Sequence, residues 1–292
     1  MQTRSSGAEC RDRDKASSFI PASATAWTAH AVTANDLQGK AIAPLRYVIP
    51  GFVPEGATLL VSRPKLGKSW LVLDLCIAIA TGRTTLGTVK PATGDVLYLA
   101  LEDGERRLQR RMTTLLPNGE TWPSRLTLAT QWKRANDGGL ADIEAWCRSV
   151  RKPTAVVVDS LDRFRSWRGH GVDQPCNAIT QLQTIANECN LAVIIVHHER
   201  KTGAGDPFDT ISGPAGIGGS ADTVMIIKRE ERGNVLYMRG RDVEESQTLM
   251  LFDRTRCKWS TAGPAAKSND RAAILAALSD AVAPMSVRDV GR

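Results

Sequence analysis

The sequence predicts an α/β fold in which a mostly parallel central sheet has helices on both faces and continues into a C-terminal antiparallel β extension. From Tyr47 onward, short β-branched runs alternate with longer helical segments, which is typical of a sheet covered by helices. Most of these runs are apolar at nearly every position, as expected for central strands that are buried on both faces. The runs are residues 57–61, 96–101, 155–158, 192–196 and 223–227.

Apolar residues at helical spacing predict helices between these runs. The first helix follows Ser69 and ends at Gly82, and the second follows Gly104 and ends before Pro117, because glycine and proline commonly terminate helices. A third helix carries an apolar stripe over residues 179–189. Further along the chain, residues 235–238, 248–252 and 257–260 predict a β meander that extends the sheet.

The chain divides into three predicted segments. Residues 1–40 are rich in Ser, Ala, Thr, Arg and Asp and contain few large aliphatic residues, which predicts a disordered N-terminal tail. Residues 41–262 are predicted to form one domain, since 292 residues with 42% hydrophobic content can bury a sizeable core. Residues 263–292 are interpreted as a linker followed by the start of a further unit.

Composition excludes several classes of protein. The sequence has no run of the roughly 18 apolar residues that a membrane helix needs, and its N-terminus lacks the apolar core of a secretory signal, so we expect a cytoplasmic protein. The six cysteines are scattered without a CxxC pair, which favours reduced thiols over a metal site. The net charge of +7 favours polyanionic partners.

A phosphate-binding loop is predicted where the first run meets the first helix. The pattern G-x-x-x-x-G-K-[ST] is meaningful in this context because it lies between an apolar strand and an apolar helix. Backbone N–H groups would cradle the phosphates, Lys68 would reach the β- and γ-phosphates, and the Ser69 hydroxyl would bind Mg²⁺. Ser62 stands where the pattern has its first glycine. A serine is tolerated at this position if its φ is negative. The predicted nucleotide-binding residues are Ser62, Arg63, Pro64, Lys65, Leu66, Gly67, Lys68, Ser69 and Trp70.

Carboxylates follow two of the predicted strands, at the edge of an α/β sheet where ligands collect. Asp159 closes a buried run in a Walker-B pattern and is the second predicted Mg²⁺ ligand. Glu102 comes directly after another run and is the predicted general base for the attacking water. Asp103 is the competing base, whereas Glu105 suits the first turn of the following helix.

Two histidines, His197 and His198, end the run 192–196 at the same predicted edge. An imidazole in this position could sense the γ-phosphate of a bound nucleotide. The spacing alone leaves open which of the two histidines would do so.

The order of these parts resembles the RecA-like ATPases over residues 45 to 260. Within them the sequence is most similar to the AAA_25 or RepA-like group, which is related to the DnaB-type hexameric helicases. The matching phrases are "IPGFVPEGATLLVSRPKLGKSWL", "VLYLALEDGERRLQRRM", "VVVDSLDRF", "VHHERK" and "ISGPAGIGGSADTVMIIKR".

This resemblance implies an ATPase that uses Mg²⁺ and assembles as a hexamer with each ATP between two protomers. It implies Glu102 as the base and favours His198 as the γ-phosphate sensor, because His198 precedes Lys201 as in the H-x-x-K element of related ATPases. The resemblance also implies that Arg241 is an arginine finger acting on a neighbour's ATP and that Arg239 is its phosphate-contacting companion.

Two predicted loops have the composition of a single-stranded DNA-binding surface. The first, residues 162–171, mixes arginines with aromatic residues, which suits phosphate contact and base stacking. The second, residues 199–220, is rich in glycine and holds two basic residues. The resemblance places DNA-binding loops here, although the first loop could instead pack on a neighbouring subunit. The predicted DNA-binding residues are Arg163, Arg165, Trp167, Arg168, Arg200 and Lys201.

The leading hypothesis is an oligomeric, ATP-driven motor on single-stranded DNA, namely a replicative helicase of a mobile element. Residues 269–292 resemble the truncated start of a winged-helix domain. The sequence shows no appended primase, zinc or N-terminal helicase-collar domain, so we expect loading onto DNA to need a partner such as a replication initiator or a primase. One alternative is a regulatory or recombination ATPase similar to RadA or KaiC, which switches without unwinding DNA. Another is a nucleotide- and DNA-binding module that does not hydrolyse ATP.

Overall fold

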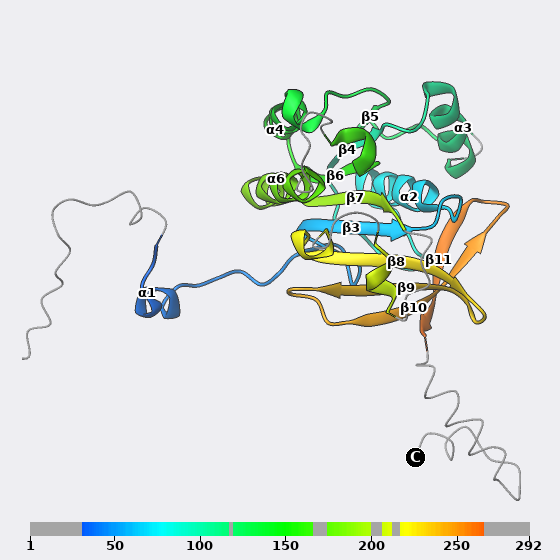
Figure 1. The fold of residues 1–292 in the computed structure, drawn as a ribbon. Helices are drawn as coiled ribbons and strands as arrows, with labels where there is room; N and C mark the ends of the chain where they lie inside the picture. Colours follow the sequence, from blue (N-terminus) through cyan, green and yellow to red (C-terminus); the bar gives the residue numbers. More distant parts are fainter. Residues whose placement is uncertain (1–30, 117–118, 166–173, 200–205, 212–216, 266–292) are drawn as a thin grey trace, which may run out of the picture. The chain divides into compact units, whose positions relative to one another are not determined.

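The computed structural model describes residues 31–116, 119–165, 174–199, 206–211 and 217–265 (Figure 1). The chain forms two compact units, Met1–Pro44 and Leu45–Arg292. In the first unit, helix α1 (Ala34–Gln38) begins after Thr33, whose hydroxyl accepts a hydrogen bond from the amide of Asp36. The residues of α1 are exposed, and this short helix lies inside the predicted disordered tail. Residues 1–30 of that prediction lie outside the described residues.

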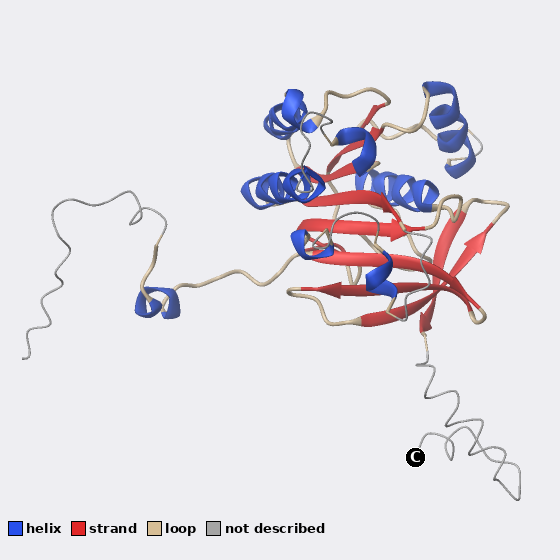
Figure 2. Ribbon diagram, viewed as in Figure 1, coloured by secondary structure: helices blue, strands red, loops and turns tan. Residues whose placement is uncertain are grey.

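The second unit is built around a mixed sheet of nine strands in the order β11-β10-β9-β8-β3-β7-β6-β4-β5 (Figures 1 and 2). The part from β8 to β5 is parallel and contains all five predicted runs. Its strands are β3 (Gly56–Ser62), β4 (Asp95–Ala100), β5 (Leu126–Ala129), β6 (Pro153–Asp159), β7 (Ala192–His198) and β8 (Thr223–Glu230). A separate hairpin of β1 (Tyr47–Ile49) and β2 (Val53–Pro54) precedes the sheet.

The predicted β meander forms the antiparallel end of the sheet. It consists of β9 (Gly233–Gly240), β10 (Ser246–Asp253) and β11 (Lys258–Pro264), which follow β8 in order. Strand β11 continues beyond the predicted run and into the predicted linker. Gly263 takes φ +101° beside an irregularity in the register, and the pairing resumes at Pro264.

Helices cover both faces of the sheet, as the sequence predicted. Alternate residues of the strands point into two apolar clusters, one shared with α2 and α3 and the other with α4, α5 and α6. The helices are α2 (Lys68–Thr81), α3 (Glu105–Leu115), α4 (Gly139–Ser149), α5 (Leu161–Phe164) and α6 (Gln174–Cys189), with short 3₁₀ turns at Ala135–Asp137, Pro207–Thr210 and Gly218–Ser220. None of the described helices is long and apolar enough to cross a membrane.

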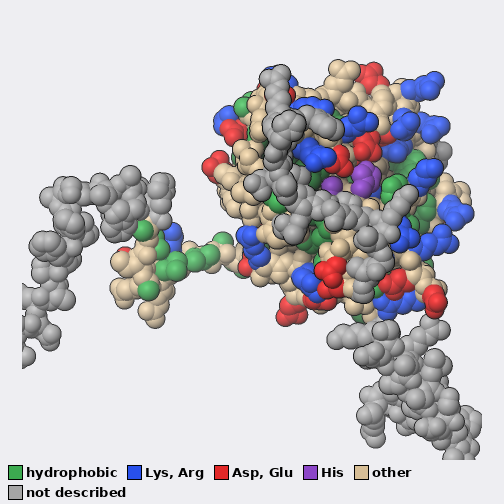
Figure 3. Space-filling model, viewed as in Figure 1, with side chains coloured by type: hydrophobic (Ala, Val, Ile, Leu, Met, Phe, Trp, Pro, Cys, Tyr) green, Lys and Arg blue, Asp and Glu red, His purple; other side chains and the backbone are tan. Residues whose placement is uncertain are grey.

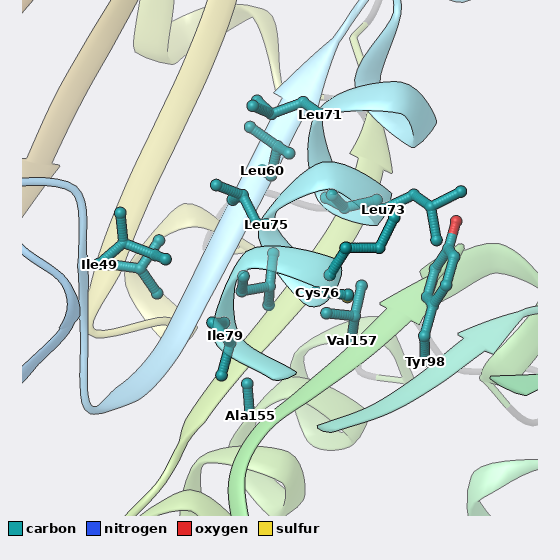
Figure 4. Packing of buried hydrophobic residues seen from close by; sticks show 14 of the residues in the cluster. Ile49, Leu60, Leu71, Leu73, Leu75, Cys76, Ile79, Tyr98, Ala155 and Val157 are labelled. Atoms are coloured by element: carbon teal, nitrogen blue, oxygen red, sulfur yellow. The ribbon is translucent and has the colours of Figure 1, made fainter. Parts of the chain in front are cut away.

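Helix α2 is the most deeply buried of these elements. Figure 4 shows its side chains from Leu71 to Ile79 lying over Leu60 and Val157 of the central strands. Its one buried carboxylate, Asp74, accepts hydrogen bonds from Arg83 and Thr85, each at 2.7 Å. The helix ends at Gly82, which takes the left-handed conformation with φ +77° as predicted for a C-terminal glycine.

The register of the parallel strands brings their carboxyl ends to one edge of the sheet. Ser62 pairs with His198, and Asp159 lies between Ala100 and Val196 of the neighbouring strands. The residues at and just after these strand ends are the ones for which the sequence predicts a role in nucleotide binding or catalysis.

Candidate functional site

The loop between β3 and α2 has the backbone of an anion-binding turn. Ser62 is the last residue of β3 and is not among the residues with positive φ, so its Cβ brings no left-handed strain. Positive φ angles occur instead at Lys65 (+65°) and at Gly67 (+104°), which directly precedes the first residue of α2. A turn of this kind at a helix N-terminus presents backbone N–H groups to a phosphate.

Lys68 lies buried beneath this loop with only 6% of the residue exposed. Its Nζ donates to the carbonyl oxygens of Ser62 (2.9 Å) and Arg63 (3.3 Å) and lies 3.4 Å from Nδ1 of His198. Burial lowers the pKa of Lys68, whereas the nearby charges of Asp159, Glu102 and Glu199 raise it. The ammonium group is therefore held among carboxylates at the edge of the sheet.

Asp159 and Ser69, the predicted Mg²⁺ ligands, lie together. The Asp159 side chain is buried at the end of β6 and hydrogen-bonds with the Ser69 side chain and with the Tyr98 hydroxyl, which donates to Oδ2 at 3.0 Å. Burial raises the pKa of Asp159, and the hydrogen bonds from Ser69 and Tyr98 oppose that shift. A carboxylate beside a hydroxyl at the mouth of a phosphate-binding turn is a set of oxygen donors that fits Mg²⁺.

Glu102 lies just past β4, across from the loop. Its Oε1 accepts a hydrogen bond from the Ser160 hydroxyl at 2.5 Å and lies 3.5 Å from Nε2 of His198. The hydrogen bond with His198 is the main cause that lowers the pKa of Glu102 to about 2, and Ser160 and the charge of Arg163 add to it against the opposing effect of burial. Glu102 is therefore ionised at neutral pH.

The competing carboxylate, Asp103, is already occupied by two guanidinium groups. Arg107 and Arg111 of α3 donate to its two oxygens at 3.1 Å and 2.5 Å, and its side chain is 6% exposed. Arg111 also lies over the ring of Trp70 at 5.4 Å, which links α3 to the start of α2. Asp103 thus supports the neighbouring helices, and Glu105 lies in the first turn of α3 as predicted.

The structure separates the two histidines. His198 lies between Lys68 and Glu102, with one ring nitrogen near each. His197, one residue earlier in β7, is buried, and its Nδ1 is 3.8 Å from Oδ2 of Asp162 in α5. His198 therefore lies beside two of the groups near the phosphate loop, the position expected of the predicted sensor. Figure 3 shows histidine side chains near the middle of this face, with acidic side chains beside them.

Arg239 and Arg241 are not brought to this site in their own chain. Gly240 pairs with Thr223, which in turn pairs with Thr58, whereas the phosphate loop begins at the other end of β3. The two arginines therefore lie at the opposite edge of the parallel sheet. Arg239 pairs with Glu245 (2.8 Å) and lies over Phe208 (4.1 Å), and Arg241 donates to the carbonyl of Gly219 (3.0 Å). Both line a pocket of about 380 Å³.

The predicted DNA-binding residues are only partly described. The charge of Arg163 in α5 acts on Glu102, which places Arg163 near the site. Arg165 pairs with Asp162 at 3.1 Å, and its carbonyl accepts a hydrogen bond from Arg134. The remaining predicted residues, Trp167, Arg168, Arg200 and Lys201, lie outside the described residues.

Four residues of the site were missed from the sequence. Ser160 donates a hydrogen bond to Glu102 and Tyr98 donates one to Asp159, and Trp259 contacts the phosphate loop from β11. The fourth, Glu199, has a buried carboxylate 3.5 Å from Nε of Arg63 and no hydrogen bond to it within the described part of the chain. Ser160 and Glu199 could have been found, because each directly follows a selected strand-end residue.

A family model matches this chain over residues 23–204. It describes the AAA domain of the AAA_25 family. The chain belongs to the AAA_25 family. Its fold and its phosphate loop are those of the RecA-like P-loop ATPases, as the sequence predicted.

Curated relatives and solved structures extend this result. The DNA repair protein RadA of Mycobacterium tuberculosis, from two strains, is 25% identical over 197 residues, which cover 65% of this chain and 35% of RadA. The chain therefore matches about a third of the length of these relatives.

Two solved structures share the fold. A KaiC-like protein from the hyperthermophilic archaeon Pyrococcus horikoshii OT3 superimposes with a TM-score of 0.53 at 15% identity, over 75% of this chain and 99% of that one. A DnaB-like replicative helicase, described with its interactions with primase, gives a TM-score of 0.55 at 14% identity, over 70% of this chain and 57% of the helicase.

Proposed function

We propose that this AAA_25 protein binds ATP with Mg²⁺, hydrolyses it, and couples hydrolysis to work on single-stranded DNA as a homo-oligomer. The convergence of Lys68, Ser69, Asp159, Glu102 and His198 at one edge of the sheet is the observation that carries this proposal. These side chains come from α2 and from the ends of β4, β6 and β7, so no local feature of the chain explains their meeting.

In the proposed binding step, the backbone N–H groups before Lys68 hold the phosphates, and the Lys68 ammonium turns from the carbonyls of Ser62 and Arg63 toward the β- and γ-phosphate oxygens. Ser69 and Asp159 would hold Mg²⁺, which supplies positive charge to the same oxygens. The bound triphosphate offers negative oxygens to Lys68 and His198, and Glu102 is then free to face the attacking water.

Glu102 would orient and polarise that water. A carboxyl group with a pKa of about 2 is a weak base, so proton acceptance is easier once the hydrogen bond from His198 is exchanged for a contact with the γ-phosphate. Ser160 keeps one oxygen of Glu102 fixed during this exchange. His198 thereby couples the presence of a γ-phosphate to the basicity of Glu102.

A second copy of the chain would complete the site. Arg241 lies at the opposite edge of the sheet with 59% of its side chain exposed, so it can reach an ATP only on a neighbouring protomer. An arginine in that role stabilises the charge that develops on the transferred phosphoryl group. We therefore propose a closed ring, with a hexamer as the leading arrangement, in which Arg239 supports Arg241.

The finer proposal is a replicative helicase of a mobile element that needs an initiator or primase partner. The fold shared with a DnaB-like replicative helicase supports it. We place the end of the ATPase domain after Pro264 rather than at residue 262, because β11 extends that far. The winged-helix interpretation of residues 269–292 stays a prediction, since they lie outside the described residues.

A switch that hydrolyses ATP without unwinding DNA is the second candidate. The sequence match to RadA and the nearly complete coverage of the KaiC-like protein favour it over a non-hydrolysing module. Turnover stimulated by single-stranded DNA together with strand separation supports the motor. Turnover without strand separation supports the switch.

The decisive experiment measures ATP turnover per protomer against protein concentration, with and without single-stranded DNA, for the wild type and for Glu102→Gln. We expect turnover per protomer to rise with concentration, because the site is shared. Glu102→Gln should still bind ATP but lose on the order of 10²- to 10⁴-fold in turnover, since the amide cannot accept a proton.

Glu105→Gln is the matched control for this variant, because Glu105 is an exposed glutamate in the first turn of α3, three residues away. It should hydrolyse ATP like the wild type. Normal turnover by Glu102→Gln would reject Glu102 as the base, and turnover per protomer that is independent of concentration would reject the shared site.

A further inference from the structure

The C-terminal β extension contacts the phosphate loop through the side chain of Trp259. This tryptophan lies in β11, only 2% of it is exposed, and its indole Nε1 donates a hydrogen bond to the carbonyl oxygen of Gly67 at 3.2 Å. Its ring also packs against Phe252 of β10, with 5.0 Å between the ring centroids. The contact joins two parts of the chain that are 192 residues apart.

Gly67 is fitted to this ring. It takes φ +104°, and a Cβ at this position would lie 3.3 Å from two atoms of the indole of Trp259. Its carbonyl also accepts the first backbone hydrogen bond of α2, from the amide of Leu71 at 3.1 Å. The Gly67 carbonyl therefore has two donors that fix its direction.

Fixing this carbonyl fixes the next amide as well. The carbonyl of Gly67 and the N–H of Lys68 belong to one planar trans peptide, in which the two groups point in opposite directions. If the carbonyl is held toward Trp259, the N–H of Lys68 points away from β11. In a phosphate loop this N–H is one of the donors that surround the phosphates.

Strand β11 is itself anchored beyond the far end of α2. The backbone N–H and the hydroxyl of Thr261 donate to the carbonyl of Leu86, at 3.1 Å and 3.3 Å. Leu86 follows the C-terminus of α2, so β11 contacts the chain on both sides of this helix. The indole of Trp259 is thus attached to a strand that cannot shift independently of α2.

We propose that Trp259 is a positioning residue of the nucleotide site, which sets the orientation of the Gly67–Lys68 peptide and thereby the affinity for the phosphates of ATP and ADP. This inference rests on the proposed nucleotide binding. The antiparallel end of the sheet would then take part in nucleotide binding. The P-loop sequence pattern alone does not predict such a part. Trp259 touches no reacting atom, so the effect should fall on binding rather than on the chemical step.

The test compares Trp259→Phe with Trp132→Phe. Trp132 is a close match, because its indole Nε1 donates to the carbonyl of Gly139, the first residue of α4, at 2.9 Å. Both variants lose one indole hydrogen bond to a glycine carbonyl at a helix N-terminus. Only Trp259 touches the phosphate loop.

Trp259→Phe should weaken MgADP binding about five-fold, as expected for one neutral hydrogen bond, and raise the KM for ATP by a similar factor with kcat unchanged. Trp132→Phe should bind MgADP like the wild type. Isothermal titration calorimetry and steady-state kinetics measure these values. MgADP should also change the tryptophan emission of the wild type and of Trp132→Phe by more than that of Trp259→Phe.

The outcomes separate the two proposals. If the wild type binds neither MgADP nor MgATP, the proposed function fails. If the wild type binds and Trp259→Phe binds with the same Kd, nucleotide binding stands and the role of Trp259 is rejected. Should Trp259→Phe unfold, benzothienylalanine at position 259 replaces it, since this isostere keeps the ring volume and lacks only the N–H. An unchanged Kd for that protein also rejects the proposal.

Discussion

Charged residues of other elements gather beside the two ends of strand β3, in different surroundings. At its carboxyl end, Lys68 and Asp159 are buried and lie among other ionisable groups that they contact or influence. At its amino end, the side chains of Arg239 and Arg241 are 46% and 59% exposed and pair with Glu245 and with the partly buried Asp222. Burying charge is costly unless the charges are paired, so at the first end groups of opposite charge lie close together. The second end presents its arginines to solvent, where another molecule can meet them.

Under the proposed function, one chain holds two complementary parts of a site. The buried end can bind and orient a nucleotide but has no arginine positioned as a finger among the described residues. The exposed end has arginines but no phosphate loop. Each of the following predictions tests this division of roles.

Lys68→Ala should have the largest effect. It removes the ammonium group that would neutralise the β- and γ-phosphates, so ATP turnover should fall below detection, with nucleotide binding lost or strongly weakened. Lys90→Ala is the control, because Lys90 is an exposed lysine outside this loop. Nucleotide binding by filter retention and phosphate release measure the two effects. Wild-type turnover by Lys68→Ala would place the phosphate site elsewhere.

Arg241→Ala should lower turnover by on the order of 10³- to 10⁵-fold while each protomer still binds ATP. In the proposed oligomer, this arginine would act on the nucleotide of the neighbour. Arg254→Ala, which changes an exposed arginine of the β10–β11 turn, should remain active.

Mixing inactive variants sharpens this test. A mixed oligomer of Arg241→Ala and Glu102→Gln contains interfaces that combine an intact Glu102 from one protomer with an intact Arg241 from the next. Part of the turnover should therefore return on mixing. No recovery in oligomers shown to be mixed would mean that the two residues do not share a site between protomers.

Sequence reasoning reached most of the fold because the parallel strands are buried on both faces. Strand β5 was not predicted, because this edge strand has only four residues, Leu126–Ala129, and none of them is fully buried. Helix α4 was not predicted either. Its start at Gly138 and Gly139 resembles a loop, and only Gly139, Ile143 and Cys147 are buried in it.

Sequence reasoning selected much of the candidate site because residues after parallel strands meet at one edge of a sheet. This rule selected Glu102, Asp159 and His198, which the structure brings into one cluster with Lys68. It could not select Trp259, because the contact with Gly67 depends on how a distant antiparallel strand folds back. Nor could it distinguish His197 from His198, since that difference depends on which face of β7 meets the loop.

The smallest predicted effect concerns the pKa of Glu102. Ser160→Ala and His198→Asn each remove a hydrogen bond that favours the ionised carboxylate, so both should raise this pKa from about 2 toward its ordinary value, His198→Asn by more because it is the larger cause. Carbon-detected NMR titration of the Glu102 carboxyl group measures the change. Equal pKa values in all three proteins would contradict the assigned contacts.

The same shift has a consequence for acid stability. Because the pKa of Glu102 is lowered in the folded state, its ionised form stabilises the fold above an unfolded pKa of about 4.3. That contribution is lost as the pH falls toward about 2. The contribution is modest, since 40% of the Glu102 side chain is exposed to solvent.

The length of strand β3 sets the distance between the arginines and the phosphate loop. Its first residues are tied to the arginine end, because the amide of Ala57 donates to Asp222, which Arg241 approaches at 3.6 Å. Its last residue, Ser62, accepts a hydrogen bond from Lys68. A buried strand of seven residues is a stiff rod of about 20 Å. The proposed ring would have to match that length, since a protomer packed at another spacing would leave each adjoining site without its arginine or without its phosphate loop.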